Sequence, residues 1–103
     1  MTYKIIFSPR FTASLDNAFG YISNDLSSPI AAENLMSEID KRISYTAENP
    51  YMYPLCPEPL SRLGYRKITV KNYIAVYLIK EEEKAVHFLD FIYGRQNYID
   101  ILK

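Results

Sequence analysis

Hydrophobic side chains recur at spacings of three and four residues in two successive segments of the N-terminal half. The first stripe is Phe11, Leu15, Ala18, Phe19, Ile22 and Leu26, and the second is Ile30, Leu35, Met36, Ile39 and Ile43. Such spacing places the apolar residues on one face of a helix. A serine followed by proline precedes each stripe, as at a helix N-cap and first helical position, and Asn49-Pro50 ends the second. The pattern predicts two amphipathic helices, which the short link between them makes antiparallel.

Shorter segments rich in β-branched and aromatic residues occupy the rest of the chain. "YKIIF" (Tyr3–Phe7) precedes the first helix, and Tyr65–Val70, Tyr73–Ile79 and Ala85–Tyr93 follow the second. These segments predict one N-terminal strand and three later strands, which form an antiparallel meander because their connections are short. Between the second helix and the meander, residues 49–63 contain four prolines and predict an ordered or semi-rigid loop.

The middle strand of the meander is apolar on both faces. Ile74, Val76 and Leu78 alternate with Tyr73, Ala75, Tyr77 and Ile79. We therefore expect this strand in the centre of a sheet, with the helices over one face and the proline loop, the C-terminal tail or a partner over the other. In the free chain, Tyr and Ile on the second face would leave an exposed apolar patch for a partner.

The predicted fold class is α+β, in the order β-α-α-β-β-β. An N-terminal strand and an antiparallel helical hairpin pack with a mostly antiparallel sheet, which the C-terminal three-strand meander completes, and a short helical tail follows. The chain has 103 residues, of which 49% are apolar, enough for one core. We expect a single domain spanning 1–103.

Composition narrows the class of protein further. The apolar runs are too short to span a membrane, and charged residues and Pro9 interrupt the first twenty positions, so we expect a soluble, cytoplasmic protein without membrane contact. The single cysteine, Cys56, cannot form an internal disulfide or a zinc site. No residue cluster calls for a metal or an organic cofactor.

The formal net charge is zero, but the charge is segregated along the chain. Residues 1–61 carry four basic and seven acidic side chains, and residues 62–103 carry eight and five. A neutral protein with this distribution can still present an anion-binding face. The alternative is that exposed lysines on strands only discourage edge pairing.

Three stretches resemble the RelE/ParE toxins of bacterial type II toxin-antitoxin systems. They are "GYRKITVKNYIAVY" (Gly64–Tyr77), "FIYGRQNY" (Phe91–Tyr98) and "ISNDLSSPIAAENL" (Ile22–Leu35), and the resemblance in element order covers nearly the whole chain. It implies the toxin of a plasmid-stabilisation module, which arrests growth. The resemblance also implies a cognate antitoxin that neutralises the toxin in a hetero-oligomeric complex.

The resemblance leaves two activities open. RelE-like members are mRNA interferases, ribosome-dependent endoribonucleases in which a ribose 2′-hydroxyl attacks the neighbouring phosphate. ParE-like members inhibit DNA gyrase by binding it. The sequence pI of about 6.6 and the few acid-base groups weigh against the nuclease, which needs a broad basic surface for the ribosome. A non-toxic partner-binding module of the same fold is the third alternative.

Arg66, Arg95 and Tyr98 form the candidate catalytic set that the resemblance implies. Two guanidinium groups could stabilise the charge of a pentacovalent phosphate, and the tyrosine could stack on a base or act as a general acid. The alternative is structural: the arginines would pair with carboxylates such as Asp90 or Asp100, and Tyr98 would anchor the core.

Five further residues are candidates for binding RNA or a partner: Arg62, Lys67, Lys71, Tyr73 and Tyr77. The lysines could contact a phosphate backbone, although solvated lysines in a hairpin are the commoner outcome. Strict alternation puts His87 on one face with Leu89, Phe91 and Tyr93, where we interpret it as a structural histidine with a hydrogen-bond partner. Alternation puts Asp90 on the opposite face, with Arg66 as its expected partner, and Cys56 is interpreted as incidental.

Overall fold

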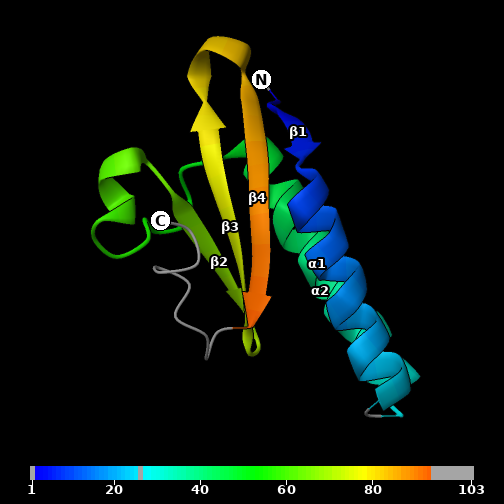
Figure 1. Cartoon of the computed structure of the whole chain (residues 1–103). Coiled ribbons are helices and arrows are strands. Elements are labelled where there is room, and N and C mark those ends of the chain that lie inside the picture. The colour runs from blue at the N-terminus through cyan, green and yellow to red at the C-terminus, as the bar shows by residue number, and fades with distance from the viewer. Residues whose placement is uncertain (1, 26, 94–103) are drawn as a thin grey trace.

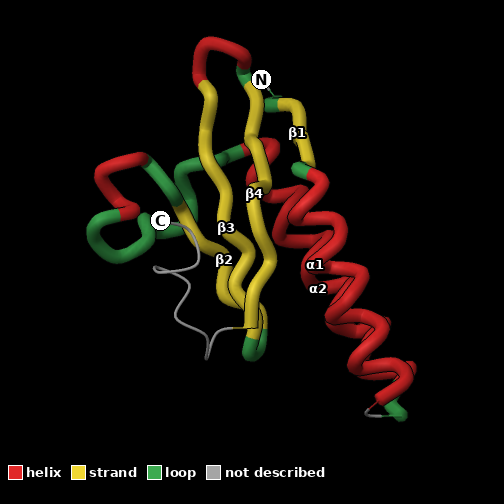
Figure 2. The backbone as a smooth tube through the Cα atoms, in the orientation of Figure 1, coloured by secondary structure: helices red, strands yellow, loops and turns green. Residues whose placement is uncertain are grey.

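The computed structural model describes residues 2–25 and 27–93, which form a helical hairpin against one side of a four-stranded sheet (Figure 1). The elements are β1 (Lys4–Phe7), α1 (Pro9–Gly20), α2 (Pro29–Glu48), β2 (Arg66–Val70), β3 (Tyr73–Lys80) and β4 (Ala85–Tyr93). The strand order is β1-β4-β3-β2, with β1 parallel to β4 and the other neighbours antiparallel (Figure 2). The predicted fold class and the central position of β3 are confirmed. The predicted helical tail lies outside the described residues.

The helix boundaries follow the serine-proline and asparagine-proline signals. The Ser8 hydroxyl accepts a hydrogen bond from the Phe11 amide at 3.0 Å and caps α1. After Gly20 the helix continues as one π-helical turn, Tyr21–Asp25. The second helix begins at Pro29, although the Ser28 side chain makes no capping bond, and it ends at Glu48 before Asn49-Pro50.

The main core lies between the helices and the sheet. It contains Phe11, Leu35 and Ile39 from the helices, and Tyr77 and Phe88 from β3 and β4. The apolar stripes predicted these helical residues, but Ile30 is 73% exposed and does not belong to the core. Ile30 lies in the first turn of α2, where Figure 1 shows the hairpin extending beyond the sheet. Periodicity therefore placed it on a face that has no sheet to cover it.

The second face of the sheet is covered by the proline loop. Ile74 and Val76 of β3 pack with Cys56 and Leu60 of that loop, and their exposed fractions are 7% and 0%. The bridge between Leu55 and Arg66 fixes the loop along the edge of β2. The loop is ordered, as predicted. The exposed patch expected from Tyr and Ile side chains is wrong, because Tyr77 is buried and Tyr73 and Ile79 pack against the main core on the helix side.

A bulge in β4 overturns the strict alternation expected for that strand. Tyr77 pairs with Phe88 while the preceding residue of β3, Val76, pairs with Asp90, which leaves Leu89 without a partner in the ladder. Phe88 and Phe91 consequently both belong to the main core.

Within residues 2–25 and 27–93, no helix combines the length and the apolar character needed to cross a membrane.

Candidate functional site

The first region of interest surrounds Arg66, the one candidate catalytic residue among those described. Arg66 begins β2, and its Nη1 donates a hydrogen bond to the Tyr53 carbonyl at 2.6 Å. Its guanidinium carbon lies 5.1 Å from the centre of the Tyr51 ring, within the range of a cation-π contact. Arg66 is therefore used to hold the loop that follows α2. Arg95 and Tyr98 lie outside the described residues, so their proposed meeting with Arg66 stays a prediction.

The contacts of Arg66 continue into a polar network that joins three parts of the chain. Tyr51 and Tyr3 both donate hydrogen bonds to the Glu81 carboxylate, the former at 2.9 Å. These bonds lower the pKa of Glu81 and raise the pKa of both tyrosines. Lys84 lies 3.5 Å from Glu81 and covers the Tyr3 ring. We call Tyr3, Tyr51, Arg66 and Glu81 the closed network, because each of these side chains contacts another part of the protein.

The other basic candidates have different surroundings. Arg62 is exposed and pairs with Glu58 at 2.7 Å. Lys67 is half-buried in β2, and its amide donates to the Pro54 carbonyl. Lys71 occupies the turn between β2 and β3 with a left-handed φ of 56° and is exposed. Lys71 follows the end of β2 opposite to Arg66.

The two tyrosine candidates differ in exposure. Tyr77 is 0% exposed, and its hydroxyl donates to the Pro50 carbonyl at 2.7 Å, so a partner cannot reach it in this fold. Burial raises its pKa. Tyr73 is half-buried, stacks on Phe91 with 5.0 Å between ring centres, and has a pKa raised by burial.

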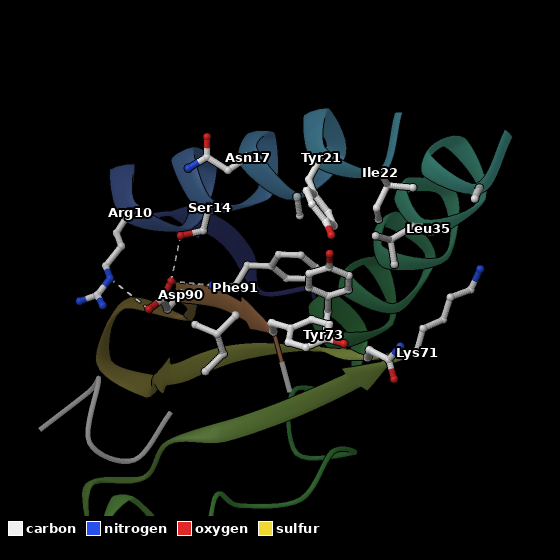
Figure 3. Close-up of a pocket in the computed structure, with 15 residues that line it drawn as sticks. Arg10, Ser14, Asn17, Tyr21, Ile22, Leu35, Lys71, Tyr73, Asp90 and Phe91 are labelled. Atoms are coloured by element: carbon white, nitrogen blue, oxygen red, sulfur yellow. Dashed lines mark hydrogen bonds and ion pairs between the residues drawn. The ribbon is translucent and has the colours of Figure 1, made fainter. Parts of the chain in front are cut away.

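A groove of about 900 Å³ lies between α1 and the sheet, and Tyr73 and Lys71 line it. We call this the α1–sheet groove. Figure 3 shows Tyr21 pointing into it from the helices, with Tyr73 and Phe91 on the opposite side. Tyr21 is 51% exposed. The groove therefore combines aromatic walls with open access.

A buried carboxylate forms one wall of the groove. Asp90 is 1% exposed, and its Oδ1 accepts hydrogen bonds from the Phe91 amide at 2.8 Å and from Ser14 at 3.2 Å. Its Oδ2 lies 3.0 Å from Nε of Arg10, an ion pair that lacks good hydrogen-bond alignment, and it has no hydrogen-bond partner within the described residues. The expectation that Arg66 pairs with Asp90 is wrong, because Arg10 does so.

Sequence reasoning missed Arg10, Ser14 and Tyr21. Arg10 and Ser14 are four residues apart and so share one side of α1, but nothing local connects them to a carboxylate almost eighty positions away. Tyr21 lies in the π-helical turn after α1. The alternation of polar and apolar residues predicts neither the contacts of Arg10 and Ser14 with Asp90 nor the π-helical turn that carries Tyr21.

The two remaining side chains that could react, His87 and Cys56, are respectively paired with an acid and buried. His87 Nε2 lies 2.9 Å from Glu83 Oε1, which supplies the expected partner and lowers the pKa of Glu83. Cys56 is 2% exposed, and burial raises the pKa of its thiol. Among residues 2–25 and 27–93, no group of three or more His, Cys, Asp or Glu side chains is arranged to hold a metal ion.

Comparison with known proteins agrees with this architecture. A structure of the chromosomal ParDE toxin-antitoxin system from P. aeruginosa has a TM-score of 0.71 at 16% identity, covering 89% of this chain and 96% of that chain. The RelBE2 toxin-antitoxin complex from Mycobacterium tuberculosis has a TM-score of 0.65 at 14% identity, covering 90% and 99%. A mutant of the E. coli toxin RelE in the free state has a TM-score of 0.64 at 16% identity, covering 98% and 93%. At these identities the likeness shows the fold alone.

The assignment of the chain to a family comes from its sequence. No curated protein sequence gives a significant match. The family model described as "ParE toxin of type II toxin-antitoxin system, parDE" matches residues 5–98, nearly the whole chain. The chain therefore belongs to the RelE/ParE family of toxins, within the ParE toxins of type II toxin-antitoxin systems.

Proposed function

We propose that this toxin arrests growth by binding DNA gyrase and that a cognate antitoxin neutralises it. The family match to ParE toxins supports this choice, because the resemblance associates ParE-like members with gyrase. The antitoxin follows by analogy with the ParDE and RelBE systems among the structural neighbours.

The observation that carries the choice of mechanism is the engagement of Arg66. A phosphate-stabilising arginine must direct its donors at the substrate. Arg66 instead donates to the Tyr53 carbonyl and lies over the Tyr51 ring, both in the loop that follows α2. Releasing it for catalysis would cost the contacts that hold this loop.

Five of the described tyrosines are also poorly suited to acid-base chemistry. A general acid or base works best with a pKa near the operating pH. The pKa values of Tyr3, Tyr51, Tyr53, Tyr73 and Tyr77 are all raised, which moves them further from neutrality. His87 is paired with Glu83.

Controlled expression in bacteria, followed by mapping of transcripts and DNA, tests the mechanism. We expect growth arrest with intact messages and with broken or relaxed DNA, and we expect the purified toxin to inhibit gyrase supercoiling. Cleavage of messages within translated codons would instead support the nuclease. Absence of arrest would support the non-toxic binding module.

Arg66→Lys provides a matched control for the argument from Arg66. Lysine keeps the charge but loses the planar fork of donors that binds phosphate in two places. A gyrase-binding toxin should keep its toxicity in this variant if the variant folds. A folded but non-toxic Arg66→Lys protein would contradict the proposal.

A further inference from the structure

The free end of the helical hairpin extends beyond the sheet and exposes apolar side chains (Figure 1). Phe19, near the end of α1, is 38% exposed. Ile30, in the first turn of α2, is 73% exposed, the largest fraction among the large hydrophobic residues of the described chain. Single exposed apolar residues are ordinary, so a binding surface requires further features at the same place.

The backbone at Gly20, next to Phe19, does not require a glycine. Its φ is not positive, and a Cβ at this position would meet no atom of the neighbouring elements within 4 Å. Glycine inside a helix lowers the stability of the helix relative to alanine, because it has more conformational freedom to lose. A π-helical turn, Tyr21–Asp25, follows directly, and such turns are frequent at functional sites. The space over Gly20 is therefore open to the close approach of a partner.

The hairpin carries negative charge over most of its length. Residues 11–40 contain no Lys or Arg and five acids, namely Asp16, Asp25, Glu33, Glu38 and Asp40. Asp16 lies three residues before Phe19, and Glu33 lies three residues after Ile30, so each of these exposed acids shares a side of its helix with an exposed apolar residue. We call Asp16, Phe19, Gly20, Ile30 and Glu33 the hairpin tip.

We propose that the hairpin tip binds a basic surface of DNA gyrase, with its apolar side chains against apolar residues and its two acids against lysines or arginines. This inference rests on the gyrase binding of the proposed function and names the surface of the toxin that carries it out. Charge complementarity selects the occupant, because an enzyme that binds DNA neutralises phosphates with Lys and Arg along the DNA path. Apolar residues bordered by polar ones are the usual composition of a protein–protein interface.

Two matched pairs of variants test the proposal. Ile30→Ala shortens the exposed apolar side chain of the tip, and Leu63→Ala does the same to a 61% exposed residue in the loop that follows α2. Glu33→Gln removes the charge of a tip acid, and Asp40→Asn removes that of an exposed acid seven residues further along α2. All four side chains are exposed, so the variants should fold.

The measurements are the inhibition of supercoiling by purified DNA gyrase and the calorimetric affinity of each variant for that enzyme. We expect Ile30→Ala to weaken both about tenfold and Glu33→Gln about threefold, and each control to stay within about twofold of the wild type. The effect of Glu33→Gln should shrink at high salt, because screening weakens exposed charge pairs.

Gly20→Ala separates binding from stability in a single variant. Alanine is the better helix former, so the urea midpoint of this variant should equal or exceed that of the wild type. We expect the added methyl group to weaken inhibition of gyrase about fivefold, because it occupies space into which the partner packs. Unchanged inhibition by Gly20→Ala would contradict the placement of gyrase on the tip.

Equal inhibition by the wild type, Ile30→Ala and Glu33→Gln would overturn this inference while leaving the proposed function in place. A wild-type chain that neither binds nor inhibits gyrase would overturn both. If Ile30→Ala kept full inhibition but lost its complex with the co-expressed antitoxin, the tip would belong to the antitoxin instead.

Discussion

The closed network and the α1–sheet groove are built from the same kinds of side chain but use them differently. In the closed network, Arg66 contacts the Tyr53 carbonyl and the Tyr51 ring, and Glu81 accepts bonds from two tyrosines. In the groove, Arg10 is paired with Asp90 through one nitrogen and its side chain is 57% exposed. Tyr21 of the groove and Tyr51 of the network are equally exposed, at 51% and 50%, so exposure of the tyrosines does not separate the two regions. The side chains of the network bind one another and the loop after α2, whereas the cations of the groove, Arg10 and Lys71, remain exposed to solvent.

This difference shows that the number of basic residues in a segment does not locate a binding site. The stretch from Arg62 to Lys71 is the most basic part of the sequence, but Arg62 and Arg66 are both engaged within the protein. Arg10 comes from the acidic half of the chain, and its 57% exposed side chain lines the groove. A binding site is better located by the hydrogen-bond donors that are not already used within the folded protein.

The largest effect should come from removing the carboxylate that the groove buries. Asp90→Ala leaves the buried Phe91 amide without its acceptor and frees Arg10, which should cost about 1–3 kcal/mol of unfolding free energy. Asp90→Asn keeps an acceptor for the amide and should cost less. Urea denaturation followed by circular dichroism measures both. If the two variants were equally stable, the amide bond would not be the source of the effect.

The next effect belongs to the closed network. Arg66→Ala removes the bond to the Tyr53 carbonyl and the contact with Tyr51, and should lower the unfolding free energy by about 1–2 kcal/mol, less than for a buried charged bond because Arg66 is half-exposed. The same urea experiment measures it. If Arg66→Ala were as stable as the wild type, the fold would not depend on the contacts of Arg66. Arg66 would then again be a candidate for phosphate binding.

Much of the fold could be predicted because its signals are local. Ser8-Pro9, Pro29 and Asn49-Pro50 act within one helical turn, and the two apolar faces of β3 indicate a central strand without reference to its neighbours. The predictions failed where the outcome depends on distant parts of the chain. Ile30 fits the stripe, but whether a sheet lies beneath it is a property of the packed molecule.

The candidate site was harder to predict for the same reason. A single extra residue in β4, Leu89, changes which residues share a face, and no local sequence signal marks it. The pairing of Asp90 with Arg10 in place of Arg66 depends on α1 lying beside β4, which neither segment specifies alone. Tyr73 and Lys71 were predicted for a binding role and do line the groove, but their role there stays a prediction.

A smaller effect should appear when the closed network is titrated. Its tyrosines lower the pKa of Glu81 below the ordinary value of 4.5, so folding releases a proton that the unfolded chain binds more tightly. The network's contribution is therefore present above about pH 4.5 and is lost as pH falls through the lower folded pKa. Tyr51→Phe removes one donor, so its stability should approach that of the wild type as the solution is acidified.

Glu83 supplies the internal comparison for that titration. Its pKa is also lowered, by His87, and it titrates in the same acidic range without contacting Tyr51. Urea midpoints of Tyr51→Phe and wild type across pH 3–6 isolate the contribution of Glu81, since that of Glu83 is common to both. A difference between the two proteins that is constant with pH would show that the bond does not depend on the charge of Glu81.

The smallest effect on stability should come from Lys71, an exposed residue in the turn between β2 and β3. Lys71→Glu changes an exposed turn residue, so the unfolding free energy should move by less than about 0.5 kcal/mol. Arg66 of the closed network should behave differently, because its contacts hold the loop that follows α2. Urea denaturation of Lys71→Glu beside Arg66→Ala therefore separates the two regions. A stability loss as large as that of Arg66→Ala would mean that the groove, too, is part of the scaffold.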